Sequence, residues 1–311
     1  MSNEEEKQPN EELPLHRFSC EAMATDFIVL IAGSDKSYAP RAAQASFDEL
    51  LRLEAELSKF NPNSDISRIN AATAGQSVVV GLETFQCLQR CLELYEQTAG
   101  AFDITVGPLM RCWLTEDKQI RTPSPDQLKQ ARVRTGTDLL RLNEDEHTVE
   151  SLSEGIEIDL GGIGKGFAAD KMREILADWE LGIFFISGGR SSVYAAGAGA
   201  DGDGWELTIS DPRDRSKLLA TVYMRNRALG ASGLEAGSHI IDAREGRPVR
   251  GRFGAWSNCP DATTADALST AFMIMSVEEI EDFCERFPEV AAMVLTEEDG
   301  QEQLLKFGNR F

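Results

Sequence analysis

Histidine is scarce in this 311-residue chain, and its cysteines are scattered. The three histidines, His16, His147 and His239, are not clustered at the spacing of zinc sites, and no Cys-x-x-Cys pair occurs among the six cysteines. These absences exclude a zinc module of the usual spacing. They also predict a disulfide-free protein whose cysteines are reduced core or surface thiols.

Basic residues are also few. The chain has 31 Lys and Arg against 52 Asp and Glu, which gives a formal net charge of −21. Nucleic acid is excluded as a partner, because a phosphate backbone requires a basic face. An anionic ligand would need a local cation or a metal ion to bind such a protein, so a divalent cation is expected.

No run of about 18 apolar residues is present, so the sequence predicts no membrane span. The first residues, MSNEEEKQPNEELP, are acidic and show neither a signal segment nor a lipobox-like cysteine site. We therefore expect a cytoplasmic protein. Residues 1–14 are predicted to form a disordered acidic tail, and residues 15–311 a single domain.

The hydrophobic periodicity predicts long amphipathic helices over 40–59 and 81–99 and a short helix from Ser124 to about 133. Residues 138–160 are typical of a hairpin, and residues 182–243 are rich in strands. Two more helices and a closing hairpin complete the chain. Because strands and helices do not alternate regularly, we predict an α+β fold with mixed, largely antiparallel sheets.

The most informative stretch is Ile156 to Asp170, reading IEIDLGGIGKGFAAD. It predicts a short apolar strand ending at Asp159, a Gly-rich turn with Lys165, and a helix. Backbone N–H groups and the positive end of a helix favour phosphate at such a turn, and the lysine adds a cation. The alternative is an ordinary strand-to-helix turn, since the stretch fits neither the P-loop nor the Rossmann pattern.

A second group lies in DATTADALSTAFMIMS, residues 261–276, which predicts a Thr-capped apolar helix. Asp266 and Thr270 are four residues apart, so they share one face of the helix. A carboxylate and a hydroxyl on one face are able to ligate a hard cation such as magnesium. The alternative is a solvated aspartate beside a threonine that bonds back to its own helix.

The order of these and other motifs is more specific than any one of them. From residue 23 to residue 272 the chain reads MAT, SKFNPNSDISRIN, GAFDITVGPL, IDLGGIGKGFAAD, ISGG, ASG, HIIDAREGRP and TADALSTAF. This series resembles the FAD:protein FMN transferases of the ApbE family, over nearly the whole chain beyond the acidic tail. The third and fourth motifs are the most specific.

The resemblance implies a magnesium-dependent enzyme with FAD in a cleft between two lobes. Such an enzyme cleaves the pyrophosphate of FAD, transfers FMN to a Thr or Ser hydroxyl of a target flavoprotein, and releases AMP. The target protein is therefore the expected partner, beside FAD itself.

Matching the motifs position by position gives the implied site. The residues expected to contact FAD are Met23, Phe60, Ala101, Phe102, Asp103, Asp159, Lys165, His239 and Ile241. The implied magnesium ligands are the Gly162 carbonyl, Asp266 and Thr270. Catalytic roles fall to Lys165, Asp266 and His239.

Some positions depart from the family pattern. Ala231 replaces a threonine, Arg190 replaces an acid after the Gly-Gly pair, and Ser269 stands where many members have a second aspartate. These changes leave two further functions open on the same scaffold. One is a magnesium-dependent FAD pyrophosphatase that yields FMN and AMP, and the other is an FAD-binding protein without turnover.

Overall fold

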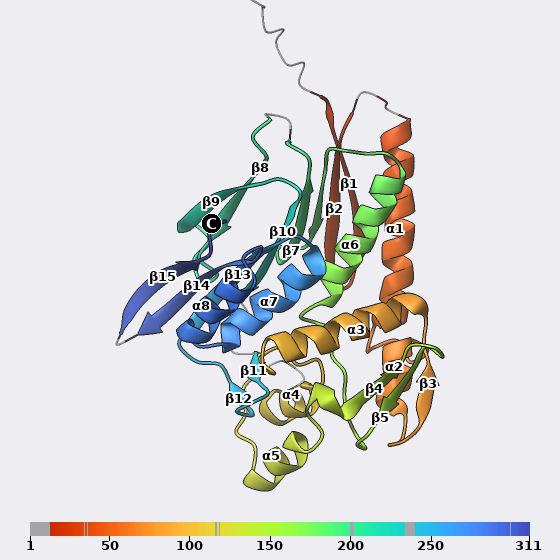
Figure 1. Ribbon diagram of the computed structural model, residues 1–311, viewed down its shortest axis with the longest axis vertical. Helices are drawn as coiled ribbons and strands as arrows, with labels where there is room; N and C mark the ends of the chain where they lie inside the picture. The colour runs from red at the N-terminus through yellow and green to blue at the C-terminus, as the bar shows by residue number, and fades with distance from the viewer. Residues whose placement is uncertain are drawn as a thin grey trace, which may run out of the picture.

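The computed structural model describes residues 13–33, 35, 37–115, 117, 119–199, 202–233, 240–298 and 300–311. The predicted acidic tail lies almost entirely outside these residues. The described part of the chain forms an upper lobe built on a large sheet and a lower lobe of shorter elements (Figure 1). All six cysteines are free, as predicted. No helix among the described residues is long and apolar enough to cross a membrane.

The upper lobe contains an eight-stranded sheet in which every neighbouring pair is antiparallel. In spatial order its strands are β1 (Leu15–Ala22), β2 (Thr25–Ala32), β6 (Phe184–Gly188), β7 (Ser192–Ala196), β10 (Arg227–Gly233), β13 (Arg252–Cys259), β14 (Ala291–Glu298) and β15 (Gln301–Phe307).

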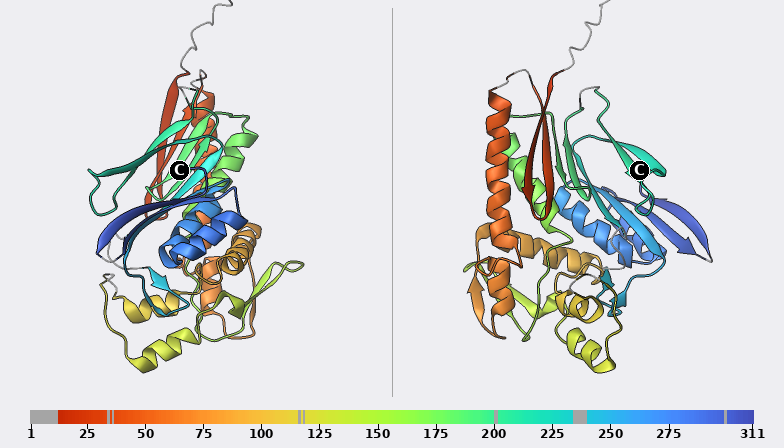
Figure 2. Two further views of the ribbon diagram at one scale, coloured as in Figure 1. Left: turned by 60° about the vertical axis from the view of Figure 1, so that its left-hand side comes forward. Right: turned by 180° about the vertical axis from the view of Figure 1, so that it is seen from behind.

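Both faces of this sheet are buried over much of its area. Successive side chains of a strand point to opposite faces, so neighbouring residues belong to different hydrophobic clusters. Tyr194 and Ala255 belong to the cluster on the helical face, whereas their neighbours Val193 and Trp256 belong to the cluster on the other face. The helical face is covered by α1 (Tyr38–Leu57), α6 (Gly164–Asp178), α7 (Ala262–Ile274) and α8 (Val277–Arg286). The opposite face is covered by a two-stranded ribbon of β8 (Trp205–Ser210) and β9 (Leu218–Met224). Figure 2 shows the ribbon and α1 at opposite sides of the lobe.

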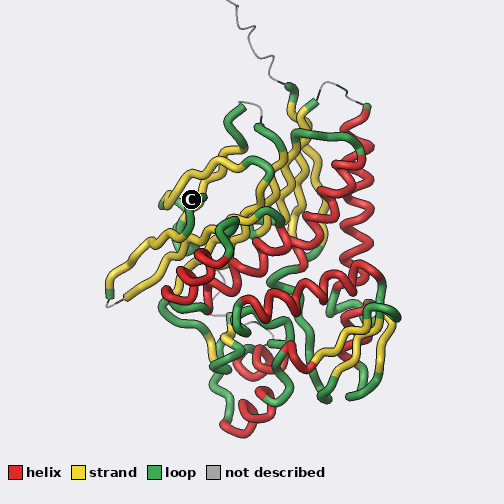
Figure 3. Tube along the Cα trace, in the orientation of Figure 1, coloured by secondary structure: helices red, strands yellow, loops and turns green. Residues whose placement is uncertain are grey.

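The lower lobe collects short elements around α3, and Figure 3 shows its small sheet well apart from the large one. Its elements are α2 (Asp65–Ala71), β3 (Ser77–Val79), α3 (Leu82–Gln97), α4 (Gly107–Trp113), α5 (Pro125–Arg132), a 3₁₀ turn (Thr137–Leu139), β4 (Leu140–Asn143), β5 (Thr148–Ser151), β11 (Ile241–Asp242) and β12 (Arg247–Pro248). The predicted α+β class with largely antiparallel sheets is therefore confirmed.

Two local predictions are wrong. Ile156–Leu160 is not part of any strand: Ile158 exchanges hydrogen bonds with the side chain of Asn70, and the Asp159 N–H donates to the Ile104 carbonyl. The segment alternates as a strand does but lacks a strand partner. Helix α7 is capped by Asp261, which accepts from the Thr264 N–H, and not by a threonine.

Helix α7 is held at its N-terminus by Asp170 of α6. This carboxylate is 6% exposed and accepts hydrogen bonds from the N–H groups of Ala262 and Thr263 and from the Thr263 hydroxyl. A carboxylate at this end also complements the helix dipole. Burial raises the pKa of Asp170 above its usual range, while these donors favour its charged form.

Close backbone approach fixes α7 along its length. A Cβ atom at Gly166 would lie 2.1 Å from the carbonyl oxygen of Ala262, and one at Gly230 would lie 2.0 Å from that of Ala265. Helix α6 and strand β10 therefore contact α7 backbone to backbone. At its C-terminal end, the buried Arg252 donates to the carbonyls of Phe272 and Met275.

We predict that Asp170→Asn lowers the free energy of unfolding by about 2–3 kcal/mol, because the amide NH₂ would face donors instead of accepting from them. Urea unfolding measures the loss. Asp178→Asn, an exposed acid at the end of the same helix, is the control and should change stability by less than about 0.5 kcal/mol. Equal stability of the two variants would contradict this role of Asp170.

Candidate active site

A pocket of about 1410 Å³ is lined by residues of both lobes. Its walls include every predicted site residue that the structure describes. These are Met23, Phe60, Ala101, Phe102, Asp103, Asp159, Gly162, Lys165, Ile241, Asp266 and Thr270. His239 lies outside the described residues, so its predicted role stays a prediction.

Gly162, Asp266 and Thr270 meet where the turn before α6 approaches α7. A Cβ at Gly162 would lie 3.0 Å from the Thr270 hydroxyl oxygen, so only glycine fits there without a shift. Asp266 is 3% exposed, accepts from the Gly166 N–H at 3.0 Å, and has the Lys165 ammonium 3.9 Å from the same oxygen. The three predicted ligands are thus brought together beside a cation.

The donor set suits magnesium. It offers a carboxylate, a hydroxyl and a backbone carbonyl, which are hard oxygen ligands, and it leaves room for oxygens of a substrate and water. Among the residues that the structure describes, no group of three or more His, Cys, Asp or Glu side chains could hold a metal ion. One protein carboxylate alone would bind the ion weakly, so a bound phosphate would have to supply the remaining negative charge.

Neighbouring hydroxyls orient this corner. Ser232 of β10 lies within hydrogen-bond distance of Ser269, at 2.8 Å, and of Thr270, at 3.2 Å. Ser269 donates a hydrogen bond back to the Asp266 carbonyl of its own helix. The alternative prediction had assigned such a bond to Thr270. The hydroxyl of Thr270 instead faces Gly162 and the pocket.

The Gly-rich turn is not an open cradle of N–H groups. The Gly161 N–H donates to Asp159, the N–H groups of Ile163 and Gly164 donate to Leu160, and that of Gly166 donates to Asp266. Most of the predicted backbone donors are therefore already used. The cation beside this turn is the Lys165 side chain, which is about one-fifth exposed and donates to the Gly161 carbonyl.

Lys59 is a site residue that the sequence analysis missed. Its ammonium forms a 2.7 Å ion pair with Asp159, and both side chains are mostly buried. It also lies 5.3 Å from the ring centroid of Phe60, which is 86% exposed at the pocket. A lysine next to the predicted flavin-contacting aromatic was the available signal, but the partner 100 residues away was not predictable.

Asp103 supports the wall on the lower lobe. One of its oxygens accepts from the N–H and hydroxyl of Thr105 and from the hydroxyl of Thr137. Burial raises the pKa of this carboxyl above its usual range. The predicted flavin-contacting loop at Ala101 to Asp103 is thereby fixed to the 3₁₀ turn at Thr137–Leu139.

Met23 and Ala24 form the two-residue turn between β1 and β2, with φ angles of 51° and 58°. Both lie in the left-handed region, which non-glycine residues rarely adopt. The Met23 N–H donates to the carboxylate of Glu54 on α1, at 2.5 Å, and this bond holds the turn against the pocket. Backbone strain of this kind is common at ligand sites.

These features define the class of protein: a two-lobed α+β protein whose interlobe pocket brings Gly162, Asp266 and Thr270 together beside Lys165. A family model described as "ApbE family" matches residues 23–294. The chain belongs to the ApbE family.

Comparison with individual proteins agrees with this family assignment. An FAD:protein FMN transferase of Salmonella typhimurium is 26% identical over 89% of this chain and 83% of its own length. One of Treponema pallidum is 28% identical over 82% and 76%. The fold matches the flavin transferase ApbE from Vibrio cholerae, with a TM-score of 0.85 at 22% identity over 95% of this chain and 97% of that one. The ApbE protein from Thermotoga maritima gives 0.82 at 27% identity, over 94% and 97%.

We predict that Asp159→Ala weakens FAD binding by about 1–3 kcal/mol, since it leaves the Lys59 ammonium and the Gly161 N–H without their partner. Lys59→Met tests the same pair, and the double variant should lose less than the sum of the two single losses. Calorimetry measures the affinities. Glu157→Ala removes a nearby acid that pairs with Arg111 instead, and it serves as the control. Unchanged FAD affinity in Asp159→Ala would refute the assignment.

Proposed function

We propose that this protein transfers FMN from FAD to a Ser or Thr hydroxyl of a target flavoprotein and releases AMP, with magnesium as its metal ion. The observation that carries the proposal is the convergence of the Gly162 turn, Asp266, Thr270 and Lys165 on the wall of one large pocket. The names of the relatives support the same activity.

The transfer is a substitution at the phosphorus of the FMN half of FAD. The acceptor hydroxyl oxygen forms the new P–O bond, the bond to the bridging oxygen breaks, and AMP leaves with that oxygen and the electron pair. The hydroxyl proton goes to a base, and we assign this task to His239, for which the resemblance implies a catalytic role. Magnesium, when bound, would stabilise negative charge on the phosphates.

The described residues have separate tasks in this scheme. Lys165 places a cation beside the pyrophosphate, where its charge stabilises the departing phosphate. Phe60 offers an exposed ring on which a flavin or adenine ring would stack. Asp159 and Lys59 hold the Gly-rich turn and the Phe60 loop together, so that the metal corner and the ring-binding surface keep a fixed separation.

The test is to incubate the protein with FAD and magnesium, with and without candidate redox proteins encoded near its gene. The proposal predicts FMN bound covalently to one of these proteins and one AMP released per FMN transferred. AMP release that needs no acceptor would indicate a pyrophosphatase, and tight retention of intact FAD would indicate a binding protein.

We also predict that magnesium and FAD bind cooperatively. FAD affinity should rise at least about tenfold with magnesium, because the pyrophosphate supplies the charge that one carboxylate lacks. Asp266→Asn should abolish this dependence without weakening metal-free FAD binding, since it removes a negative charge from the pyrophosphate site. Titration calorimetry measures both, with the exposed acid Asp282→Asn as control. Magnesium-independent FAD binding in the parent protein would contradict the metal role.

A further inference from the structure

The pocket extends beyond the residues that are predicted to contact FAD and the metal. Its volume of about 1410 Å³ exceeds the usual range, which is about 300–1,000 Å³. The predicted FAD and metal residues line one part of it. The remaining wall comes from the end of β8, from β10 and from Trp256 of β13. None of the residues that are expected to contact FAD lies on this second part.

The wall formed by β8 is an edge and not a face of the strand. Three consecutive residues, Thr208, Ile209 and Ser210, line the pocket, although Ile209 points into the core and Thr208 is exposed. Consecutive side chains of a strand point to opposite faces. No residue of β9 lines the pocket. The pocket therefore meets β8 along the edge that faces away from β9.

This edge has no strand partner in the described part of the chain, because β8 pairs with β9 alone. The Asp211 N–H donates to the Lys217 carbonyl, on the β9 side. The register with β9 shifts between Ile209 and Ser210, where the additional residue, Leu219, lies on β9. The backbone groups of β8 itself alternate in direction, so those of Thr208 and Ser210 point away from β9 and toward the pocket. An unpaired edge of this kind is a template for an added strand.

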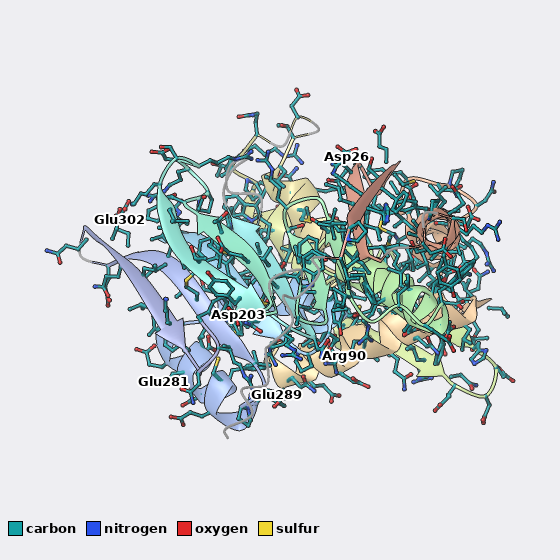
Figure 4. The ribbon with its side chains drawn as sticks, turned by 90° about the horizontal axis from the view of Figure 1, so that it is seen from above. Asp26, Arg90, Asp203, Glu281, Glu289 and Glu302 are labelled. Carbon is teal, nitrogen blue, oxygen red and sulfur yellow. The ribbon has the colours of Figure 1, made fainter. Side chains whose placement is uncertain are left out.

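The charges on this wall narrow the choice of partner. The chain carries a net charge of −21, and Figure 4 shows the labelled acids Glu281 and Glu302 on the left of the molecule and Asp26 at its top, right of the centre. This wall instead contains the exposed cation Arg190 among its described residues. Among its described residues the acid is Asp211, which pairs with Arg213 and Lys217, and the Arg213 guanidinium holds the pKa of that carboxyl well below the usual range. The wall thus suits a neutral or acidic segment.

The edge is continuous with the metal corner. Ser232 and Ala231 of β10 line the pocket beside the β8 wall, and the Ser232 hydroxyl is 3.2 Å from that of Thr270. A chain lying along β8 could therefore direct one side chain at the corner where the FAD phosphates are proposed to bind.

We propose that the acceptor segment of the target protein binds in extended form along the free edge of β8, with its Ser or Thr hydroxyl directed at the metal corner. This inference rests on the proposed transfer of FMN. Strand addition takes its affinity from main-chain hydrogen bonds, while the side chains that alternate toward the pocket provide specificity.

The first test uses synthetic peptides that carry one central threonine among varied neighbours, incubated with FAD and magnesium. Because strand addition needs no folded context, peptides should acquire FMN. In a modified peptide, N-methylation of successive backbone amides should suppress labelling at every second position, since only alternate N–H groups face β8. Labelling that tolerates N-methylation everywhere, or falls without alternation, would overturn the docking mode.

The second test changes the protein. Thr208→Pro removes an N–H group that points to the pocket and should raise the KM for the peptide roughly tenfold or more. Glu206→Pro is the matched control. Glu206 is two residues from Thr208 on the same strand, so its N–H group points in the same direction, but it lies outside the pocket. This variant should raise KM less than about threefold. FAD affinity, measured in both variants, verifies that the pocket is intact. Equal KM values in the two variants would contradict the proposal.

The two proposals fail differently. If a folded acceptor protein acquires FMN while no peptide does, the strand-addition mode is wrong and the transferase function stands. If neither acquires FMN, the transferase function fails and the docking proposal falls with it.

Discussion

The structure depends on the fixed position of α7, the helix that carries Asp266 and Thr270. Asp170 accepts hydrogen bonds from the first N–H groups of the helix, and Arg252 donates to its last carbonyls. Two glycines let α6 and β10 contact the backbone of α7. Each of these groups is buried, so water cannot replace it cheaply. Because α6 begins at the Gly-rich turn, the same packing that holds α7 also sets the distance between Gly162 and Thr270.

For the proposed magnesium site, this constraint means that a single carboxylate would be sufficient. The oxygen ligands are held ready by contacts that need no metal, while the Lys165 ammonium lies 3.9 Å from the Asp266 carboxylate. A ligand that brings its own negative charge would complete both the metal shell and the partner of the lysine. In the proposed complex the pyrophosphate would lie between the predicted flavin contact at Phe60 and the wall that ends at the β8 edge.

Much of this arrangement was predictable from the sequence, because local pattern and motif order carry the information. Helical periodicity predicted α1, α3 and α7, and the motifs predicted eleven pocket residues that the structure brings together. Contacts between residues that are distant in the sequence were not predictable. The Lys59–Asp159 pair and the Asp170 cap join residues roughly 100 positions apart. Ile156–Leu160 has the burial alternation of a strand, but Asn70 and Ile104 bind its backbone.

We propose that Gly162, Asp266 and Thr270 hold a metal ion only together with the FAD pyrophosphate. A crystal structure of the protein with FAD and manganese tests it most directly, because the anomalous signal locates the metal. The account predicts one peak within coordination distance of the Gly162 carbonyl, the Asp266 carboxylate, the Thr270 hydroxyl and a pyrophosphate oxygen, and no peak there in crystals without FAD. A metal bound elsewhere, or FAD bound with no metal at this corner, would contradict it.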